Sequence, residues 1–345
     1  MKFNIQDITR KNILALHPYS SARDEFTGEA SVFLDANENP FNTPFNRYPD
    51  PRQLALKDQI GRIKGVLAEN IFLGNGSDEP IDLLFRAFCE PGTDNVVSIA
   101  PTYGMYRVAA DINNIKFKEV LLNEDFTLDA SSVLSAVDDQ TKLIFLCSPN
   151  NPTGNALDQK QILHIIENFN GLVILDEAYI DFCPEKTLLA KLNEYPSLVI
   201  LQTLSKAWGL AGIRLGMAFA SKEIIDLLSK IKYPYNINLL TQHKALEMLK
   251  SSDAKENWVE TILTQKALLI KELHNLQNVL KIYPSDANFV LVKTTDAKKI
   301  YHALVERQII VRDRSKVVLC GEALRITVGT AEENRFLIDA LKEIG

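Results

Sequence analysis

One segment reads Thr203-Leu204-Ser205-Lys206-Ala207-Trp208-Gly209-Leu210-Ala211-Gly212-Ile213-Arg214-Leu215-Gly216, and it joins two short apolar runs at 198–201 and 215–220. Apolar runs without polar alternation are typical of strands that are covered on both faces. Lys206 lies among small and apolar residues, and desolvation lowers the pKa of a lysine, which favours the neutral amine that forms Schiff bases. Ser205 and Arg214 offer a hydroxyl and a guanidinium suited to binding a phosphate. A surface lysine in a glycine-containing loop is the alternative, and the motifs below weigh against it.

The rest of the chain predicts an α/β fold, because short apolar runs alternate with amphipathic helical patterns from about residue 65 onward. Further strands are expected at 71–73, 96–99, 143–147 and 173–175, and helices at 158–168, 221–231 and about 254–276. A β-α-β-β-α pattern follows, with strands at 288–293, 309–312 and 323–328, a helix at 296–306, and a last helix opened by the capping box Thr330-Ala331-Glu332-Glu333. We therefore expect an N-terminal arm (1–30), a large domain with a mostly parallel mixed sheet (31–275), and a small α+β C-terminal domain (276–345) that packs with the N-terminal segment.

The segment Leu172-Val173-Ile174-Leu175-Asp176-Glu177-Ala178-Tyr179 ends an apolar run in an acid. Ligands of open α/β sheets bind at the carboxyl ends of the strands. A carboxylate there either pairs with a pyridinium nitrogen and keeps it protonated, or caps a turn, and for Asp176 alone the two interpretations are equally good. Tyr179, three residues on, is a candidate hydrogen-bond donor to the phenolate oxygen of such a cofactor.

Two loops add polar groups after other expected strands. In Ser148-Pro149-Asn150-Asn151-Pro152-Thr153-Gly154, the proline at 152 restricts Asn151 to extended geometry, although ordinary Asn-Pro turns look the same. Gly74-Asn75-Gly76-Ser77-Asp78-Glu79 is a glycine turn that opens a helix, and the free N–H groups there suit an anion, while Ser77 can also serve as an N-cap. Tyr103 follows the next strand and either stacks on a planar ring or belongs to the core.

Composition narrows the class of protein. The 345 residues are 46% hydrophobic and 24% charged, and this length predicts two domains. A formal net charge of −6 argues against a nucleic-acid or anionic-membrane surface. No apolar run approaches the roughly 20 residues that span a bilayer, and the first ten residues lack a signal-peptide core, so a cytoplasmic protein is expected. Four scattered cysteines and five histidines without ligand spacing predict reduced thiols and no metal site.

Taken in order, these segments resemble the fold-type I pyridoxal-phosphate aminotransferases over nearly the whole chain. Within their class II subgroup, four further segments resemble the histidinol-phosphate aminotransferases. They are Pro18-Tyr19-Ser20-Ser21-Ala22-Arg23, Leu34-Asp35-Ala36-Asn37-Glu38-Asn39-Pro40, Arg47-Tyr48-Pro49-Asp50 and Leu324-Arg325-Ile326-Thr327-Val328-Gly329. The resemblance implies pyridoxal 5'-phosphate as cofactor and a ping-pong transamination in histidine biosynthesis, between histidinol phosphate with 2-oxoglutarate and imidazole-acetol phosphate with glutamate.

The resemblance also implies roles for individual residues. Lys206 binds the cofactor covalently and moves a proton between substrate Cα and cofactor C4′, while Asp176 pairs with the pyridine nitrogen. Tyr179 and Asn151 hold the phenolate oxygen, and Tyr103 stacks on the ring. The cofactor phosphate is bound by Ser205, Arg214 and the amides of Ser77 and Asp78, and Tyr48 reaches it from the neighbouring subunit of a homodimer with shared active sites.

Substrate recognition is implied at Tyr19, Asn37, Arg312 and Arg325. An arginine pair with a tyrosine hydroxyl can bind the phosphate ester of histidinol phosphate, and Arg325 can also bind the carboxylate of glutamate. Arg312 is otherwise a solvated strand end, and Arg314 is close enough in the chain to take its place. Asn37, together with Glu38, either contacts the substrate head or forms a turn.

Other functions share parts of this pattern. An aromatic amino-acid aminotransferase or, more remotely, an amino-acid phosphate decarboxylase keeps the same motifs, because the cofactor supplies the hard chemistry in all three. A non-catalytic regulator built on this fold would carry a basic DNA-binding extension, which this acidic chain lacks. A pure interaction protein has no use for a desolvated lysine opposite an aligned carboxylate.

Overall fold

Two β-sheets organise the computed structural model, which describes residues 3–19, 25–26, 28 and 30–344. The larger sheet has seven strands in the order β1-β7-β6-β5-β4-β2-β3. They are β1 (Ile71–Asn75), β2 (Asn95–Ala100), β3 (Lys116–Leu121), β4 (Thr141–Cys147), β5 (Leu172–Asp176), β6 (Leu198–Thr203) and β7 (Leu215–Phe219). Only β7 runs antiparallel to its neighbours, which confirms the expected mostly parallel mixed sheet.

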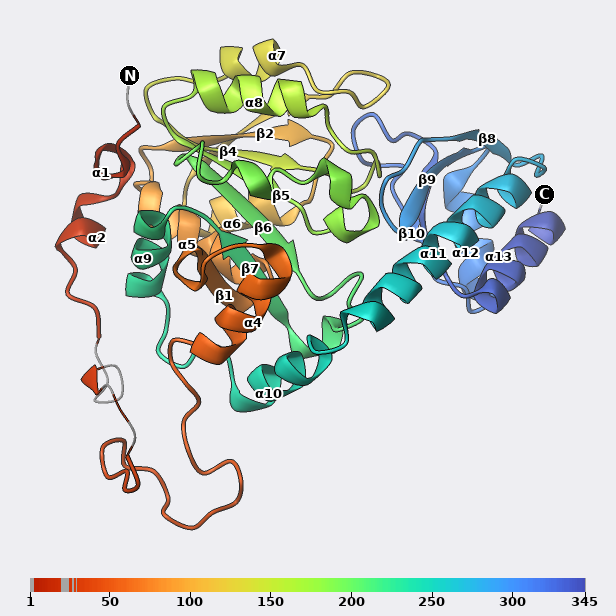
Figure 1. The fold of residues 1–345 in the computed structure, drawn as a ribbon. Coiled ribbons are helices and arrows are strands. Elements are labelled where there is room, and N and C mark those ends of the chain that lie inside the picture. The colour runs from red at the N-terminus through yellow and green to blue at the C-terminus, as the bar shows by residue number, and fades with distance from the viewer. Residues whose placement is uncertain (1–2, 20–24, 27, 29, 345) are drawn as a thin grey trace.

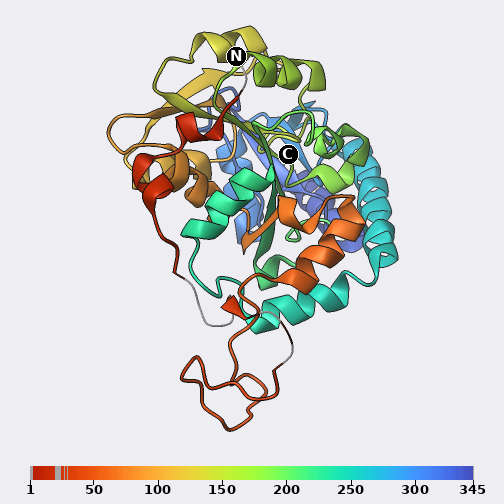
Figure 2. The same ribbon diagram turned by 60° about the vertical axis from the view of Figure 1, so that its left-hand side comes forward.

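Helices cover both faces of the larger sheet (Figures 1 and 2). One face is covered by α5 (Asp78–Phe88), α6 (Met105–Ile112) and α9 (Lys222–Ile231), and the other by α4 (Leu54–Lys64), α7 (Ala130–Ser135), α8 (Gln159–Asn168) and α10 (Leu239–Met248). Strand β5 has a continuous apolar run because both of its faces are buried. Leu172 and Ile174 pack into the core on one face, and Val173 and Leu175 pack into the core on the other.

The smaller sheet lies at the C-terminal side of the molecule (Figure 1). Its antiparallel strands have the order β10-β11-β9-β8 and are β8 (Val279–Ile282), β9 (Phe289–Thr294), β10 (Arg312–Asp313) and β11 (Ala323–Thr327). Helices α11 (Ser252–Leu273), α12 (Ala297–Glu306) and α13 (Ala331–Ile344) share a core with it. The capping box before α13 is confirmed, since the Thr330 amide donates to Glu333 Oε2 (2.8 Å) and the Glu333 amide donates to Thr330 Oγ1 (3.2 Å).

Three strands differ from expectation, all at sheet edges. Strands β3 and β8 were not anticipated, because each has a neighbour on one side only and carries lysines among its apolar residues. Strand β10 is a short pairing at Arg312–Asp313 rather than a strand over 309–312. Edge strands keep one solvated side, so their sequences lack the continuous apolar run that identifies the central strands.

The N-terminal arm packs against the large sheet's helices, not against the C-terminal part as expected. Its helices α1 (Ile5–Ile8) and α2 (Lys11–Ala15) run beside α5 and α9, with the Ile5 and Ile8 side chains on the core that these helices cover. Arg10 fixes the contact by donating to the Arg86 carbonyl (3.0 Å). Beyond the arm, the described residues up to about 50 reach away from the body (Figures 1 and 2). No helix in the described ranges is long and apolar enough to cross a bilayer.

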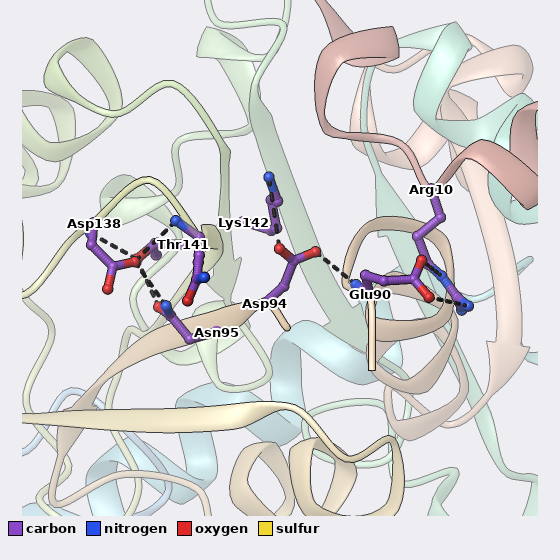
Figure 3. A network of polar contacts seen from close by, with 8 residues as sticks. Arg10, Glu90, Asp94, Asn95, Asp138, Thr141 and Lys142 are labelled. Atoms are coloured by element: carbon purple, nitrogen blue, oxygen red, sulfur yellow. Dashed lines mark hydrogen bonds and ion pairs between the residues drawn. The ribbon is translucent and has the colours of Figure 1, made fainter. Parts of the chain in front are cut away.

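A polar network closes the amino ends of β2 and β4 (Figure 3). Thr141 Oγ1 donates to Asn95 Oδ1 (2.7 Å), and Asn95 Nδ2 donates to Asp138 Oδ1 (2.8 Å). Asp138 also pairs with Lys118 (2.6 Å), and this bond is the main reason that its pKa is lowered. Beside it, Asp94 accepts from the Glu90 amide (2.7 Å), and Glu90 pairs with Arg10 (3.1 Å).

Candidate active site

A cavity lies where the carboxyl ends of β1, β4, β5 and β6 meet the start of α5. It is lined by Gly76, Ser77, Asp78, Tyr103, Cys147, Asn151, Asp176, Ala178, Tyr179, Thr203, Ser205, Lys206 and Arg214. Nine of the residues singled out from the sequence therefore meet in one place. Their spacing along the chain is wide, and only the parallel strand order brings them together.

Asp176 is the buried acid of the cavity, with 2% of its surface exposed. Its Oδ2 accepts a hydrogen bond from the Tyr106 hydroxyl (2.6 Å) and its Oδ1 accepts one from the Ala178 amide (3.0 Å). Burial raises the pKa of Asp176, and the two donors oppose that rise. The bond to Ala178 is a turn contact, which one of the two interpretations of this residue predicts, and it leaves the other interpretation open. Tyr106 was not predicted from the sequence as its partner.

Lys206 lies at the mouth of the cavity and is more exposed than its sequence neighbourhood predicted. Its pKa is nevertheless lowered, first by partial burial of the amine and then by the positive charge of Arg325. The Lys206 Nζ lies 5.5 Å from the ring centre of Tyr179, which is itself buried against Phe289. A lysine with this bias toward the neutral amine is suited to attack a carbonyl carbon.

An anion-binding cup forms at the start of α5. Ser77 makes no side-chain cap bond, so the first amides of the helix have no partner from its hydroxyl. Gly76 has φ +69°, which favours glycine, and a Cβ there would lie 2.4 Å from Arg214 Nη2, so a larger residue would also displace the guanidinium. Ser205 lies on the same cavity wall and accepts from Thr203 Oγ1 (2.9 Å). Amides, hydroxyl and guanidinium are the groups that bind phosphate in proteins.

The Asp78 carboxylate takes part in this cup, although the sequence suggested only its amide. It accepts from the Tyr103 hydroxyl (3.1 Å) and lies 3.5 Å from Arg214 Nη2. Burial and this carboxylate raise the pKa of Tyr103. The Asp78 carboxylate therefore orients both the Tyr103 ring and the Arg214 guanidinium.

Arginines from the smaller sheet form a cationic cleft next to the cavity. Arg312, Arg314 and Arg325 line it together with Lys206 and Asn151. Arg325 Nη1 donates to Asn151 Oδ1 (2.5 Å), which joins the two sheets at the site. Burial, followed by its two arginine neighbours, lowers the pKa of Arg314 to about 10. The Nε atoms of Arg314 and Arg325 are buried and have no protein acceptor among the described residues.

Three predicted residues do not reach the cavity of their own chain. Tyr48 lies outside it with its ring stacked on Tyr235 (4.5 Å between centroids). Asn37 is exposed on the same outer segment, with a positive φ of 54° that fits a turn. Tyr19 is 75% exposed and borders a separate hollow near Lys57. Residues 20–23 of the arm motif lie outside the described ranges.

Three residues of the site were not foreseen, namely Tyr106, Thr203 and Cys147. Tyr106 lies three positions after Tyr103, on a helix that starts just after a predicted strand. That spacing is the one feature of the sequence that could have indicated its place near the site. Among the described residues, no three His, Cys, Asp or Glu side chains lie together in an arrangement suited to a metal ion.

Comparison with known proteins places these residues in a wider group. The family model for aminotransferase class I and II matches residues 31–341. The histidinol-phosphate aminotransferase of Bacteroides fragilis (strain YCH46) is 58% identical over 98% of this chain and 99% of its own length, and that of Parabacteroides distasonis is 56% identical over 99% of both. The solved histidinol-phosphate aminotransferase of Clostridium acetobutylicum superposes with a TM-score of 0.80 at 25% identity, covering 87% of this chain and 91% of that one.

Proposed function

The chain belongs to the class I and II aminotransferases, and from this premise we propose that it transfers an amino group between histidinol phosphate and 2-oxoglutarate. The products are imidazole-acetol phosphate and glutamate, as in histidine biosynthesis. The observation that carries the proposal is the full-length likeness to histidinol-phosphate aminotransferases, in a chain whose Lys206, Asp176 and anion cup share one cavity.

The cavity fits pyridoxal 5'-phosphate as cofactor. The cup at Gly76–Asp78 suits its phosphate, and the buried Asp176 carboxylate, which has no cationic side chain within 4.0 Å among the described residues, suits a protonated ring nitrogen. When bound, the cofactor supplies an electron sink that stabilises negative charge at the substrate Cα. Lys206 would hold it covalently and then, released as an amine, accept and return the Cα proton.

The remaining side chains orient these groups. Asn151 and Tyr179 would present an amide and a hydroxyl to the phenolate oxygen, and Tyr103 would stack on the ring. Asn151 accepts a hydrogen bond from Arg325 (2.5 Å), which links the proposed cofactor-binding loop to the proposed substrate-binding strand. Arg214, Ser205 and the amides of Ser77 and Asp78 would hold the phosphate.

The cationic cleft accounts for the substrate. A phosphate dianion requires two or more positive groups with free donors, and Arg312 and Arg325 are paired across β10 and β11. Arg314 lines the same cleft with a buried, unpartnered Nε, so we assign the phosphate to Arg325 with Arg312 or Arg314. Arg325 also suits the α-carboxylate of glutamate in the other half-reaction.

A homodimer with shared sites completes the proposal. The outer segment that carries Asn37 and Tyr48 exposes large apolar side chains, including Leu34 (90%) and Phe41 (76%), which a second subunit would cover. Tyr48 would then reach the partner's cofactor phosphate, and Asn37 and Tyr19 the substrate end. Mixing Tyr48→Ala chains with Lys206→Ala chains tests this. An equimolar, randomly assorted mixture should regain about a quarter of the activity of the unmodified protein, because about half of its dimers are mixed and each of these has one intact site; unshared sites would give none beyond that of the separate variants.

Two coarser features belong to the same proposal. The two separate sheets support a division into arm (1–30), large domain (31–275) and small domain (276–345). All four cysteines are buried and unpaired, which suits a reducing cytoplasm.

The substrate is tested by half-reactions. Holoenzyme is mixed separately with histidinol phosphate, phenylalanine and threonine phosphate, and the loss of cofactor absorbance is followed. Rapid amination of the cofactor by histidinol phosphate, with phenylalanine far slower, is expected. Preference for phenylalanine would make this an aromatic amino-acid aminotransferase, and carbon dioxide release from threonine phosphate would make it a decarboxylase.

A further inference from the structure

Tyr106 is a buried phenol held beneath the candidate active site. It belongs to α6 and has no exposed surface. The Phe145 ring stacks on it at 4.9 Å with an interplanar angle of 22°, and the Tyr103 ring meets it edge-on at 5.5 Å. The phenol is therefore held from two sides, and its hydroxyl donates to Asp176 Oδ2 at 2.6 Å.

Asp176 depends on few groups from its own chain. Tyr106 and the Ala178 amide are the donors recorded for its two oxygens, and no cationic side chain among the described residues lies within salt-bridge distance. The residue lines the cavity, so its remaining acceptor capacity faces the ligand. Cys147, its neighbour in register on β4, directs its thiol to the Pro149 carbonyl (3.4 Å), and its sulfur also lies close to the Tyr106 hydroxyl.

The physical effect of the phenol follows from its direction. Burial favours the protonated, neutral carboxyl, whereas a hydrogen bond donated to the carboxylate favours the ionised form. A proton shared between a carboxylate and a ring nitrogen rests on the nitrogen only while the carboxylate is the weaker base. Every donor on Asp176 shifts that balance toward the nitrogen.

We propose that Tyr106 is a positioning residue that keeps Asp176 ionised, so that the shared proton rests on the ring nitrogen of the cofactor. The inference rests on the proposed function for the identity of that partner, and it assigns a task to a residue that no substrate can reach. A phenylalanine would stack on Phe145 equally well, so the hydroxyl alone carries this role.

The test compares Tyr106→Phe with Tyr195→Phe. Tyr195 also donates to a carboxylate, Glu167 (2.8 Å), but on the surface, so its variant removes the same type of bond elsewhere. In holoenzyme with ¹⁵N-labelled cofactor, the ring-nitrogen resonance of Tyr106→Phe should move toward the unprotonated position. The kcat should fall about tenfold with KM within about twofold, since an unpaired buried acceptor costs roughly one tenfold step. Tyr195→Phe should match the unmodified protein in both.

A second measurement needs no cofactor. Infrared titration of the apoprotein, labelled with ¹³C at aspartate carboxyls, should show the buried Asp176 carboxyl protonating about one pH unit higher in Tyr106→Phe. Fluorotyrosine at 106, a stronger donor, should move it the other way. An unchanged carboxyl titration together with an unchanged nitrogen resonance would overturn the proposal. If the protein never loads cofactor on Lys206, the proposed function fails, while the apoprotein titration still decides whether Tyr106 controls Asp176.

Discussion

Polar residues of similar kinds lie at both ends of the central strands, but the two ends differ in whether these side chains have bonding partners within the protein. At the amino ends, Asn95, Asp138 and Thr141 are bonded to one another and to backbone groups, so that each has a protein partner (Figure 3). At the carboxyl ends, the Asp176 carboxylate has no cationic partner within 4.0 Å among the described residues, and the Nε of Arg325 has no acceptor there. Buried polar groups without partners are costly. At the carboxyl ends, a ligand in the cavity or the cleft could complete their bonding.

Lysine removal gives the largest predicted difference between the two ends. Lys206→Ala should lower kcat on the order of 10⁴-fold or more, because the variant loses both the covalent link and the proton carrier. Lys142→Ala, which removes a long ion pair to Asp94 (3.8 Å) at the amino ends, should leave kcat unchanged. Steady-state kinetics on the two purified variants measures both kcat values. Comparable losses of kcat in both variants would show that the two ends of the strands do not differ in function.

The next largest difference is expected between the two aspartates, Asp176 at the carboxyl ends and Asp138 at the amino ends. Asp176→Asn should lower kcat about 10²- to 10³-fold, because a neutral amide cannot stabilise a protonated ring nitrogen. Asp138→Asn should cost stability without changing kcat, since it breaks the bonds to Lys118 and Asn95. Activity assays and urea unfolding of both variants measure the two effects, and a kcat loss in Asp138→Asn would contradict the assignment.

The same acids should give opposite pH dependence in apoprotein stability. Burial raises the pKa of Asp176 in the folded state, so its folded form binds more protons, and stability falls as pH rises through the range between the unfolded and folded pKa values. The pKa of Asp138 is lowered, so its contribution is present above the unfolded value of about 4 and is lost as pH falls further. Asp176→Asn should flatten the first change and Asp138→Asn the second in denaturant midpoints measured across pH. Interchanged effects would show that the electrostatic assignments are wrong.

A smaller effect is expected at the anion cup. Gly76→Ala places a Cβ where Arg214 now lies and strains a backbone at φ +69°. Cofactor affinity should fall about tenfold, corresponding to roughly 1.4 kcal/mol. Gly65 also has φ +69°, but nothing lies within 4 Å of a Cβ there. Gly65→Ala is therefore the control for backbone strain alone. Equal affinities in the two variants, measured by titrating apoprotein with cofactor, would argue against the cup.

The smallest predicted effect on function is at the amino ends. Thr141→Val leaves the Asn95 oxygen and the Asp138 amide without their present partner, which should lower the free energy of unfolding by about 1–3 kcal/mol. Neither kcat nor cofactor affinity should change. A loss of cofactor affinity would mean that the two ends of the sheet are coupled.

The sequence foretold the central strands and most of the cavity for one physical reason. Strands buried on both faces must be apolar, so a polar residue just after such a run marks the carboxyl end of a parallel strand, as with Asp176 and Asn151. Strand β3 escaped because an edge strand with a solvated side keeps its lysines. Strands can therefore be predicted from the sequence most surely where burial on both faces requires apolar residues.

Contacts between distant segments could not be predicted in this way. Tyr106 meets Asp176 across 70 positions of sequence, and nothing in either segment marks the other. Tyr19, Asn37 and Tyr48 were grouped with the site by resemblance, but their segments point away from the cavity of their own chain. In the proposed homodimer their placement would depend on a second subunit, which a single chain's folding pattern does not encode.

The most direct test of the central claim is to find where the cofactor is attached. Holoprotein is reduced with borohydride, digested, and the peptides that carry the cofactor are identified by mass spectrometry. We predict one modified peptide, with the label on Lys206, and none in Lys206→Ala. Stoichiometric label on a different lysine, or a reducible adduct that survives in Lys206→Ala, would contradict the assignment of the carboxyl ends of the strands as the active site.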